Sequence, residues 1–303
     1  MLTRRKMLQI SAGLLVCPGS ALFAASALPL IQRSIPSTGE RIPVIGMGSS
    51  RTFDVDSQSE SEARLRDVMQ AFFKSRGSVI DSSPMYGEAE SRIGDVLRSM
   101  QPAPKVFAAT KVWTQGREQG IAQMQRSAER MHVERFDLIA VHNLNDWKTQ
   151  LKTLKAWKAE GKVRYIGITT SHGRYHHDLA DIMRQQPLDF VQFSYNINNL
   201  DAEKVLLPLA QDRGIATMIN RPYQRGQLFR ASRGKPLPAL AQDIGCRSWG
   251  QFYLKFILAH PAVSCIIPAT SKTKHMIDNM GANFGPVPDQ QQRREMLSLF
   301  GAL

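Results

Sequence analysis

A regular alternation of two kinds of segment constrains this chain more than any other feature. Short apolar runs, rich in β-branched residues, recur along it, and longer stretches separate them. The runs, which we interpret as strands, are Val44–Met47, Val79–Asp81, Val106–Thr110, Leu138–His142, Val163–Ile168, Phe190–Phe193, Ile215–Ile219 and Cys265–Pro268. Strands buried on both faces are apolar throughout, and strands that alternate with helices form parallel sheets. The alternation therefore predicts an α/β fold with eight parallel strands.

The stretches between the runs have the spacing of amphipathic helices. One apolar set recurs every three or four residues, at Leu65, Val68, Met69 and Phe72. Two more sets follow the same rule, namely Ile93, Val96 and Leu97, and then Leu151, Leu154 and Trp157 with Gly161 as a helix stop. Each stretch thus has one apolar face to lay against the sheet.

Two architectures contain such an alternation, a closed (β/α)₈ TIM barrel and an open doubly wound sheet. The open sheet would need a G-x-G-x-x-G turn after its first strand, but Gly46-Met47-Gly48 is only a fragment of it, and Arg51 stands where the third glycine belongs. The length fits one barrel of roughly 250 residues or slightly more. We therefore expect a single barrel domain over residues 28–303. A hairpin over Ile31–Ile42, with its turn at Ser37–Glu40, is expected to precede the barrel.

Residues 1–27 have the pattern of a twin-arginine signal peptide. Arg4-Arg5 precedes a mildly apolar stretch, Ile10–Phe23, and Ala25-Ser26-Ala27 offers small residues for cleavage. The twin-arginine export machinery would carry the folded protein to the periplasm or beyond. If the signal is not functional, the protein stays in the cytoplasm. The alternative interpretation is a basic start followed by a core helix.

The formal net charge of +13 restricts the classes of partner. A basic surface can attract nucleic acid or an anionic membrane. However, the chain has no dense Lys/Arg run and no nucleic-acid motif, so we expect no nucleic-acid partner. We also expect no stable membrane span in the mature chain. No metal site is expected either, because His172 and His176 have helical i, i+4 spacing but no further ligand series accompanies them. Attraction of phosphorylated or acidic ligands is the better use of the charge.

An acid, a lysine and a histidine stand at the ends of three successive predicted strands. They are Asp81, Lys111 and His142, and Tyr86 follows the acid by five residues. Alone, each residue is more often a turn residue, a solvated cation or a satisfied histidine. In a barrel, however, the carboxyl ends of the strands surround the active site. Their order on consecutive strand ends therefore indicates one shared site.

These motifs resemble those of the aldo-keto reductase superfamily. The four strand-end residues are similar to the family's catalytic tetrad, with Tyr86 followed by Gly87 and Lys111 preceded by Ala-Thr. The segment Gly161–Gly167 resembles the family's fifth-strand motif, and Ile267–Lys272, leading to His275 and Asn279, resembles its nucleotide-binding end. The resemblance spans about residues 31–281.

The resemblance implies an NADPH-dependent oxidoreductase that reduces an aldehyde or ketone to an alcohol. Tyr86 would be the general acid, Lys111 would stabilise its phenolate, Asp81 would hold Lys111, and His142 would donate a hydrogen bond to the substrate oxygen. A cation about 4 Å from the phenol, at an effective dielectric of ~20, is worth roughly 4 kcal/mol, or about three pKa units before desolvation. We therefore expect the pKa of Tyr86 to lie near neutrality.

The resemblance also assigns cofactor contacts, with NADP(H) favoured over NAD. The implied residues are Thr169, Thr170, Gln192, Asn220, Arg221, Ser271, Lys272, His275 and Asn279. The chain departs from the family at three of these. Thr170 replaces an asparagine, Asn220 replaces an aromatic residue that often stacks on the nicotinamide, and His275 replaces an arginine of one family pattern.

The substrate pocket is expected in the loops after the strands, because those loops set specificity in a barrel. Trp113, Trp147 and Tyr223 follow the third, fourth and seventh strands, and the polar loop Ser49–Gln58 follows the first. Each tryptophan could equally pack beneath a loop.

Two other function classes remain at this point. One is a non-catalytic NADP(H)-binding regulatory or redox-sensing module, and the other is a periplasmic binding protein for a small anion. The joint presence of the four tetrad residues favours the reductase.

Overall fold

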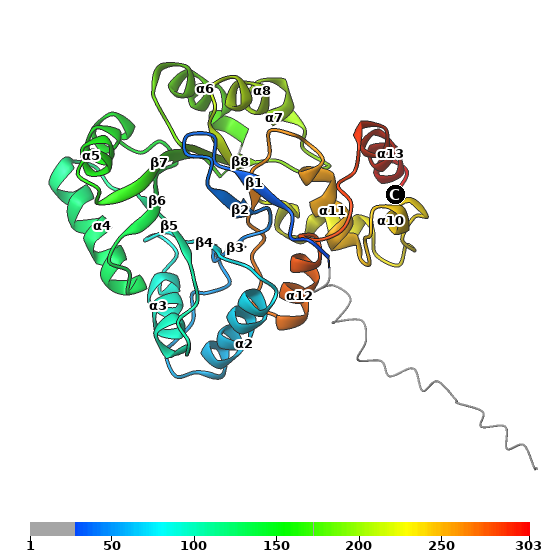
Figure 1. Cartoon of the computed structure of the whole chain (residues 1–303), viewed down its shortest axis with the longest axis horizontal. Coiled ribbons are helices and arrows are strands. Elements are labelled where there is room, and N and C mark those ends of the chain that lie inside the picture. The colour runs from blue at the N-terminus through cyan, green and yellow to red at the C-terminus, as the bar shows by residue number, and fades with distance from the viewer. Residues whose placement is uncertain (1–27, 172) are drawn as a thin grey trace, which may run out of the picture.

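The computed structural model describes residues 28–171 and 173–303, so the predicted signal peptide lies outside the described residues. Within them, eight parallel strands form one sheet with the order β10-β9-β8-β7-β6-β5-β4-β3 (Figure 1). The strands are β3 (Met47–Gly48), β4 (Val79–Asp81), β5 (Phe107–Val112), β6 (Phe136–His142), β7 (Val163–Thr169), β8 (Phe190–Ser194), β9 (Ala216–Asn220) and β10 (Cys265–Ile266). Each predicted run corresponds to one of these strands.

The first and last strands meet and close the barrel. The backbone N–H of Gly46 donates to the carbonyl of Ile266 at 2.8 Å, and that of Ile266 donates to Val44 at 2.8 Å. A parallel bridge also joins Ile45 to Ile266. At this seam the pairing is by isolated bridges, so the continuous strands are shorter than the predicted runs Val44–Met47 and Cys265–Pro268. The predicted (β/α)₈ barrel is confirmed.

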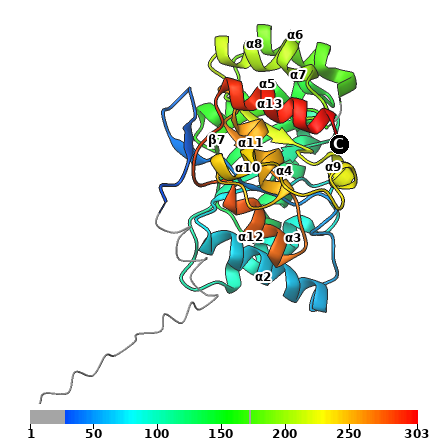
Figure 2. The same cartoon turned by 90° about the vertical axis from the view of Figure 1, so that its right-hand side faces the viewer.

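Helices surround the barrel on the outside, as Figures 1 and 2 show. They are α2 (Glu60–Lys74), α3 (Ala89–Ser99), α4 (Arg117–Met131), α5 (Trp147–Ala159), α6 (His176–Gln185), α7 (Asp201–Lys204), α8 (Leu206–Asp212), α9 (Gln227–Ala231), α10 (Leu240–Asp243), α11 (Trp249–Leu258), α12 (Thr273–Gly281) and α13 (Gln290–Gly301). Short 3₁₀ helices occupy Gly173–Tyr175 and Gln224–Gly226. The predicted apolar face of α2, Leu65 to Phe72, is buried against the sheet.

The predicted hairpin is present and covers one end of the barrel. Strands β1 (Gln32–Ser34) and β2 (Arg41–Pro43) pair in antiparallel register. Ile35 and Ile42, at the tip side of the hairpin, join the buried cluster that fills the barrel interior. An ion pair between Glu40 and Arg164 fastens it to β7, and the Tyr165 hydroxyl donates to Glu40 at 2.6 Å. The hairpin lies at the left in Figure 2.

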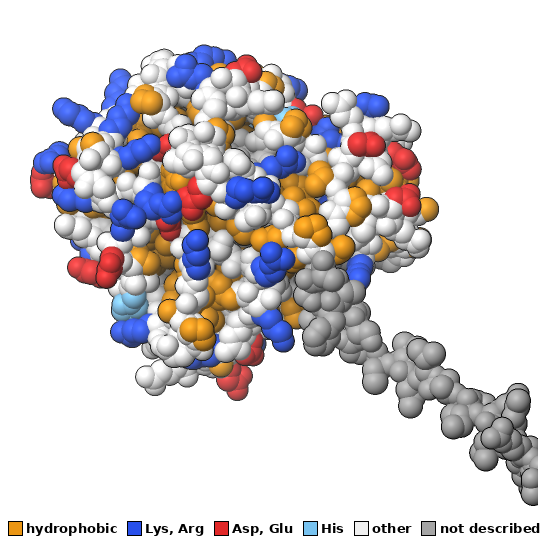
Figure 3. Space-filling model, viewed as in Figure 1, with side chains coloured by type: hydrophobic (Ala, Val, Ile, Leu, Met, Phe, Trp, Pro, Cys, Tyr) orange, Lys and Arg blue, Asp and Glu red, His pale blue; other side chains and the backbone are white. Residues whose placement is uncertain are grey.

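The surface shows no concentration of charge on the face that carries the hairpin. In Figure 3 the Lys and Arg side chains are scattered over this face among acidic and hydrophobic ones. In the part of the chain that the structure describes, no helix has both the length and the apolar character needed to cross a bilayer.

Candidate active site

A cavity of about 1110 Å³ lies over the carboxyl ends of the strands. Of the predicted site residues, Asp81, Tyr86, His142, Gln192, Asn220, Arg221, Tyr223, His275 and Asn279 line it, together with residues of the polar loop after β3. A second hollow of about 900 Å³ lies outside the barrel between α4 and α5, and no predicted site residue lines it. The cavity at the strand ends is therefore the candidate active site.

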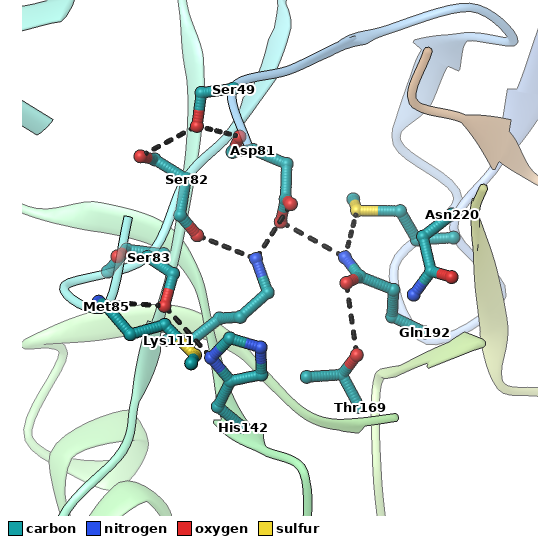
Figure 4. Close-up of polar contacts among 12 residues, drawn as sticks. Ser49, Asp81, Ser82, Ser83, Met85, Lys111, His142, Thr169, Gln192 and Asn220 are labelled. Carbon is teal, nitrogen blue, oxygen red and sulfur yellow. Dashed lines mark hydrogen bonds and ion pairs between the residues drawn. The ribbon is translucent and has the colours of Figure 1, made fainter. Parts of the chain in front are cut away.

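The side chain of Lys111, at the end of β5, is fully buried and firmly held (Figure 4). Its Nζ donates to Asp81 Oδ2 at 2.7 Å and to the carbonyl of Ser82 at 2.6 Å. Burial alone would lower the pKa of Lys111, but the negative charge of Asp81 and its hydrogen bond to the ammonium help to raise that pKa above its ordinary value. Lys111 therefore stays a cation at neutral pH, as its expected role requires.

Tyr86 lies beside this ammonium, with Lys111 Nζ 5.4 Å from the centre of its ring. Burial raises the pKa of the Tyr86 phenol, and Lys111 lowers it, but not enough to bring it back to the ordinary value. Asp81 raises it further and so cancels part of the effect of Lys111. The expectation of a pKa near neutrality is thus wrong, because desolvation and the buried carboxylate outweigh the lysine. Tyr86 keeps its proton at neutral pH.

His142, at the end of β6, meets Tyr86 edge to face, with ring centres 5.8 Å apart. Burial first, and then the nearby Lys111 charge, hold the pKa of His142 well below its ordinary value, so the imidazole is neutral. Ser83 Oγ lies 2.9 Å from His142 Nδ1 and already accepts the N–H of Met85. In the tautomer with Nδ1 as the acceptor, Ser83 donates its hydroxyl proton to Nδ1 and the ring proton lies on Nε2.

Gln192 on β8 links the predicted cofactor residues to the catalytic pair. Thr169 Oγ1 donates to Gln192 Oε1 at 3.0 Å, and Gln192 Nε2 donates to Asp81 Oδ1 at 3.1 Å (Figure 4). Asp81 therefore accepts from Lys111 on one oxygen and from Gln192 on the other. Through this second contact, the carboxylate of Asp81 on β4 holds Lys111 and also Gln192 on β8, four places along the sheet.

Thr170 and Asn220 lie next to this network. Asn220 Nδ2 donates to the carbonyl of Thr170 at 2.9 Å, and Asn220 Oδ1 accepts from Ser194 at 2.7 Å. The hydroxyl of Thr170, in contrast, is buried and has no partner. Buried hydroxyls are nearly always hydrogen-bonded, so this oxygen is an exception. Neither Thr169 nor Thr170 is among the residues that line the cavity, whereas Gln192 and Asn220 are.

The predicted nucleotide end is only partly brought to the cavity. His275 and Asn279 of α12 line it, and Tyr223 Oη donates to Asn279 Oδ1 at 2.6 Å. Ser271 and Lys272 are exposed just before the first turn of α12 and are not lining residues. They stand at the rim, where the free N–H groups of the helix start are also accessible.

Two of the three predicted substrate-pocket residues lie elsewhere. The backbone of Trp113 is bonded on both sides to the side chain of Gln123 in α4, which turns this loop outward, and the indole is 42% exposed. Trp147 begins α5 and packs on the main core cluster. Neither lines the cavity, which corrects the prediction, whereas Tyr223 does.

The cavity also has walls that the sequence did not indicate. Met85, Phe229 and Trp249 supply apolar surface, although Phe229 and Trp249 belong to helices α9 and α11 rather than to the loops directly after strands. Ser50 lies beside Tyr86 and lowers its pKa by hydrogen bonding. Ser50 belongs to the polar loop Ser49–Gln58, so the predicted position of that loop at the mouth is confirmed.

Comparisons with known proteins point to one family. The family model described as the aldo/keto reductase family matches residues 44–294. Glyoxal reductase of Bacillus subtilis is 24% identical over 249 residues, covering 80% of this chain and 83% of that protein. The 9,11-endoperoxide prostaglandin H2 reductase of Trypanosoma cruzi is 24% identical over 263 residues, covering 84% and 87%.

Solved structures show the same fold. An aldo-keto reductase from Klebsiella pneumoniae, crystallised in complex with NADPH, superposes with a TM-score of 0.74 at 19% identity, covering 89% of this chain and 96% of that one. The holo form of an aldo-keto reductase from Bacillus halodurans gives 0.73 at 18% identity, covering 89% and 96%. The family match spans most of the barrel, and the chain belongs to the aldo/keto reductase family.

Proposed function

We propose that the protein reduces an aldehyde or ketone to an alcohol, with NADPH as hydride donor and Tyr86 as proton donor. The observation that carries the proposal is the arrangement of Asp81, Lys111, Tyr86 and His142 at one end of a single cavity. A fully buried ion pair is costly to maintain. A protein that only bound a dinucleotide would gain nothing from placing one beneath a tyrosine, so the geometry favours the enzyme over the non-catalytic module.

The residues present fit the proposed cofactor. The cavity, at about 1110 Å³, is at the upper end of the roughly 300–1000 Å³ typical of small-molecule and cofactor sites, so it has room for a cofactor. Gln192 and Asn220, which line the cavity, would hold the carboxamide end, with Thr169 and Thr170 hydrogen-bonded behind them. When bound, the reduced nicotinamide supplies the hydride to the carbonyl carbon. The solved Klebsiella pneumoniae relative was crystallised with NADPH, which supports this choice.

The far end of the cofactor would lie at the start of α12. His275 and Asn279 face the cavity there, and Ser271 and Lys272 stand at its rim. A helix start offers free N–H groups to a phosphate, and Lys272 adds a positive charge. These contacts favour NADP over NAD, since NADP carries an additional phosphate.

Tyr86 then supplies the proton, and the other three residues of the tetrad support that transfer. Tyr86, protonated at neutral pH, donates its proton to the carbonyl oxygen as that oxygen becomes negative. His142 Nε2–H donates a hydrogen bond to the same oxygen and stabilises the developing charge. Lys111 stabilises the phenolate left behind, and Asp81 keeps Lys111 charged and in place. Because the phenol's pKa is raised by burial, the ammonium is needed to make its deprotonation feasible at all.

The first test compares Tyr86→Phe with Tyr165→Phe, which also loses one hydroxyl but at the hairpin end of the barrel. We expect the kcat for aldehyde-dependent NADPH oxidation to fall by about 10² or more in Tyr86→Phe, because the proton donor is gone. Tyr165→Phe should keep its kcat, and both should bind NADPH equally by fluorescence. Equal activity in Tyr86→Phe and the wild type would contradict the role of Tyr86. NADPH binding without turnover in the wild type would support the non-catalytic module instead.

We also propose that residues 1–27 direct export through the twin-arginine machinery, on the strength of the Arg4-Arg5 pair and the small residues before position 28. The double variant Arg4→Lys/Arg5→Lys should leave the uncleaved protein in the cytoplasm, whereas the wild type should reach the periplasm. Cell fractionation with immunodetection measures this. The variant Arg33→Lys/Arg41→Lys, which changes two arginines of the hairpin, is the control and should be exported normally. Wild-type protein found uncleaved in the cytoplasm would refute the signal.

A further inference from the structure

The Ser83 side chain is the hydrogen-bond partner of the His142 imidazole. Ser83 lies in the segment between β4 and α3, and both residues are buried. Its Oγ is 2.9 Å from His142 Nδ1 (Figure 4). His142 Nε2, in contrast, has no hydrogen-bond partner among the described residues, and His142 lines the catalytic cavity. One ring nitrogen is thus engaged inside the protein, and the other is available to a ligand.

Two arrangements of protons are compatible with this contact. In the first, Ser83 donates its hydroxyl proton to Nδ1, and the ring proton lies on Nε2. In the second, Nδ1–H donates to Ser83 Oγ, and Nε2 carries only a lone pair. The low pKa of His142 keeps the ring neutral, and a neutral imidazole has one ring proton, so the two arrangements exclude each other.

The other contact of the Ser83 hydroxyl favours the first arrangement. Ser83 Oγ already accepts the backbone N–H of Met85 at 3.4 Å. In the second arrangement Oγ would accept twice, and its own proton would have no acceptor among the described residues. Buried polar groups without a partner are costly and rare. In the first arrangement the hydroxyl donates once and accepts once, so every group is satisfied.

The backbone of Ser83 also contacts Tyr86, the proposed proton donor. The backbone N–H of Tyr86 donates to the Ser83 carbonyl at 3.0 Å and closes the turn that carries the phenol. Ser83 therefore holds the phenol's turn through its carbonyl and the imidazole through its hydroxyl. The phenol and the imidazole must both reach one substrate oxygen, so their relative position affects the rate.

We propose that Ser83 is a positioning residue that fixes the Nε2–H tautomer of His142 and orients this N–H toward the substrate oxygen. This inference rests on the proposed reductase function, in which Nε2–H stabilises the charge that develops on that oxygen. Ser83 acts through His142 and does not contact the reacting atoms. Because the charge develops during the reaction, Ser83 should affect the transition state more than the binding of the carbonyl substrate.

The first measurement is an NMR experiment on the ring nitrogens of His142 without substrate, so it does not depend on turnover. The signals are assigned by their absence from His142→Gln. In the wild type we expect a protonated Nε2 and an unprotonated Nδ1. In Ser83→Ala both nitrogens should be partly protonated, since the two tautomers then exchange. A proton on Nδ1 in the wild type would overturn the inference without any Ser83 variant, and so would an unchanged tautomer in Ser83→Ala.

The second measurement is the steady-state reduction of an aldehyde by NADPH. In Ser83→Ala we expect kcat to fall by about tenfold, the effect of one buried hydrogen bond, with KM for the aldehyde and Kd for NADPH nearly unchanged. Ser264→Ala is the matched control, since it also removes a buried serine hydroxyl. That hydroxyl accepts the backbone N–H of Thr217 at 3.0 Å, at the amino ends of β9 and β10. Ser264→Ala should keep both kcat and the His142 tautomer.

The two measurements separate failure of this inference from failure of the proposed function. Unchanged kcat in Ser83→Ala would refute the role of Ser83 in the reaction. An equal fall of kcat in Ser264→Ala would refute it too, because the loss would then follow from lower stability. A wild type without turnover would refute the proposed function, whereas the expected change of tautomer in Ser83→Ala would still support the action of Ser83 on His142.

Discussion

Two lysines of this barrel, Lys111 and Lys255, are both fully buried, yet their surroundings are opposite. Lys111 donates to a carboxylate, Asp81, and to one carbonyl. Lys255 on α11 donates to two carbonyls, those of Phe284 and Pro286, each at 2.6 Å. Among the described residues no acid lies within ion-pair distance of Lys255. The pKa of Lys111 is raised, whereas burial lowers the pKa of Lys255 to about 8.

The difference shows what a carboxylate adds that carbonyl dipoles do not. Carbonyls satisfy the N–H groups of an ammonium, but they do not offset the loss of its hydration, so desolvation dominates at Lys255. Asp81 supplies a full opposite charge, and Lys111 remains a cation for the chemistry.

Lys255 has a structural position instead. It ties α11 to the loop after α12, in which Asn283 Oδ1 accepts the backbone N–H of Ile45 at 2.8 Å. Ile45 belongs to the barrel seam. The partner of a buried lysine therefore separates a catalytic cation from a structural one.

The largest difference between the two lysines is expected in catalysis. Lys111→Met should lower kcat/KM by about 10³ or more, because the phenolate of Tyr86 loses the charge that stabilises it. Lys255→Met should leave kcat unchanged, since Lys255 donates to the carbonyls of Phe284 and Pro286 and not to a tetrad residue. Steady-state kinetics, corrected for the folded fraction of each protein, measures both. Loss of kcat in folded Lys255→Met would abolish the distinction drawn here.

Folding provides the control for this experiment. Lys111→Met leaves Asp81 as an unpaired buried charge, which costs about 3–5 kcal/mol and lowers the folded fraction. The double variant Lys111→Met/Asp81→Asn removes both charges and should regain much of that stability without regaining activity. Recovery of activity in the double variant would mean that Lys111 acts only by neutralising Asp81.

The second contrast is in the pH dependence of stability. Lys255 has a folded pKa of about 8, below the ~10.4 of an unfolded lysine, so the unfolded chain binds more protons between these values. Its burial cost is therefore present in full below pH 8 and is relieved as the pH rises toward ~10.4, by about 3 kcal/mol. Lys111 has a raised folded pKa, so its contribution is present below ~10.4 and is lost as the pH rises through the folded value.

Urea unfolding from pH 7 to pH 10.5 measures this second contrast. The free energy of unfolding of the wild type minus that of Lys255→Met should increase over this range. Subtracting the variant removes the titration of all other groups that the two proteins share. A flat or falling difference would show that Lys255 keeps its proton in the folded state, and that the two carbonyls hold an ammonium as well as Asp81 does.

These two lysines also show which features could be predicted from the sequence and which could not. The strands and the tetrad were predictable because apolar runs and the order of strand-end residues are local patterns, and the barrel brings their ends together by its topology alone. Lys255 gave no comparable signal. It interrupts the apolar run Trp249–Leu258, and its carbonyl partners lie some thirty residues further along the chain.

The sequence-based predictions that failed concern the pKa of Tyr86 and the residues that line the cavity. Both depend on burial and on the direction of loops, which the sequence alone does not give. The pKa of Tyr86 was misjudged because desolvation and the field of Asp81 appear only when the side chains are placed in three dimensions. Trp113 was placed in the pocket because it follows a strand, but one glutamine on α4 turns its loop outward. Phe229 and Trp249 were missed since they reach the cavity from helices rather than from strand ends.

The smallest difference between the two lysines is expected in their effect on the pKa of His142. Its pKa is lowered first by burial and second by the charge of Lys111, so removing that charge should raise it only in part. An NMR titration of the imidazole should find His142 neutral well below pH 6.5 in the wild type and in Lys255→Met, with a modest upward shift in the double variant Lys111→Met/Asp81→Asn. A downward shift, or none, would show that the Asp81–Lys111 pair acts on His142 as a neutral unit. The field of Lys111 would then be confined to Tyr86, and the contrast between the two lysines would rest on the phenol alone.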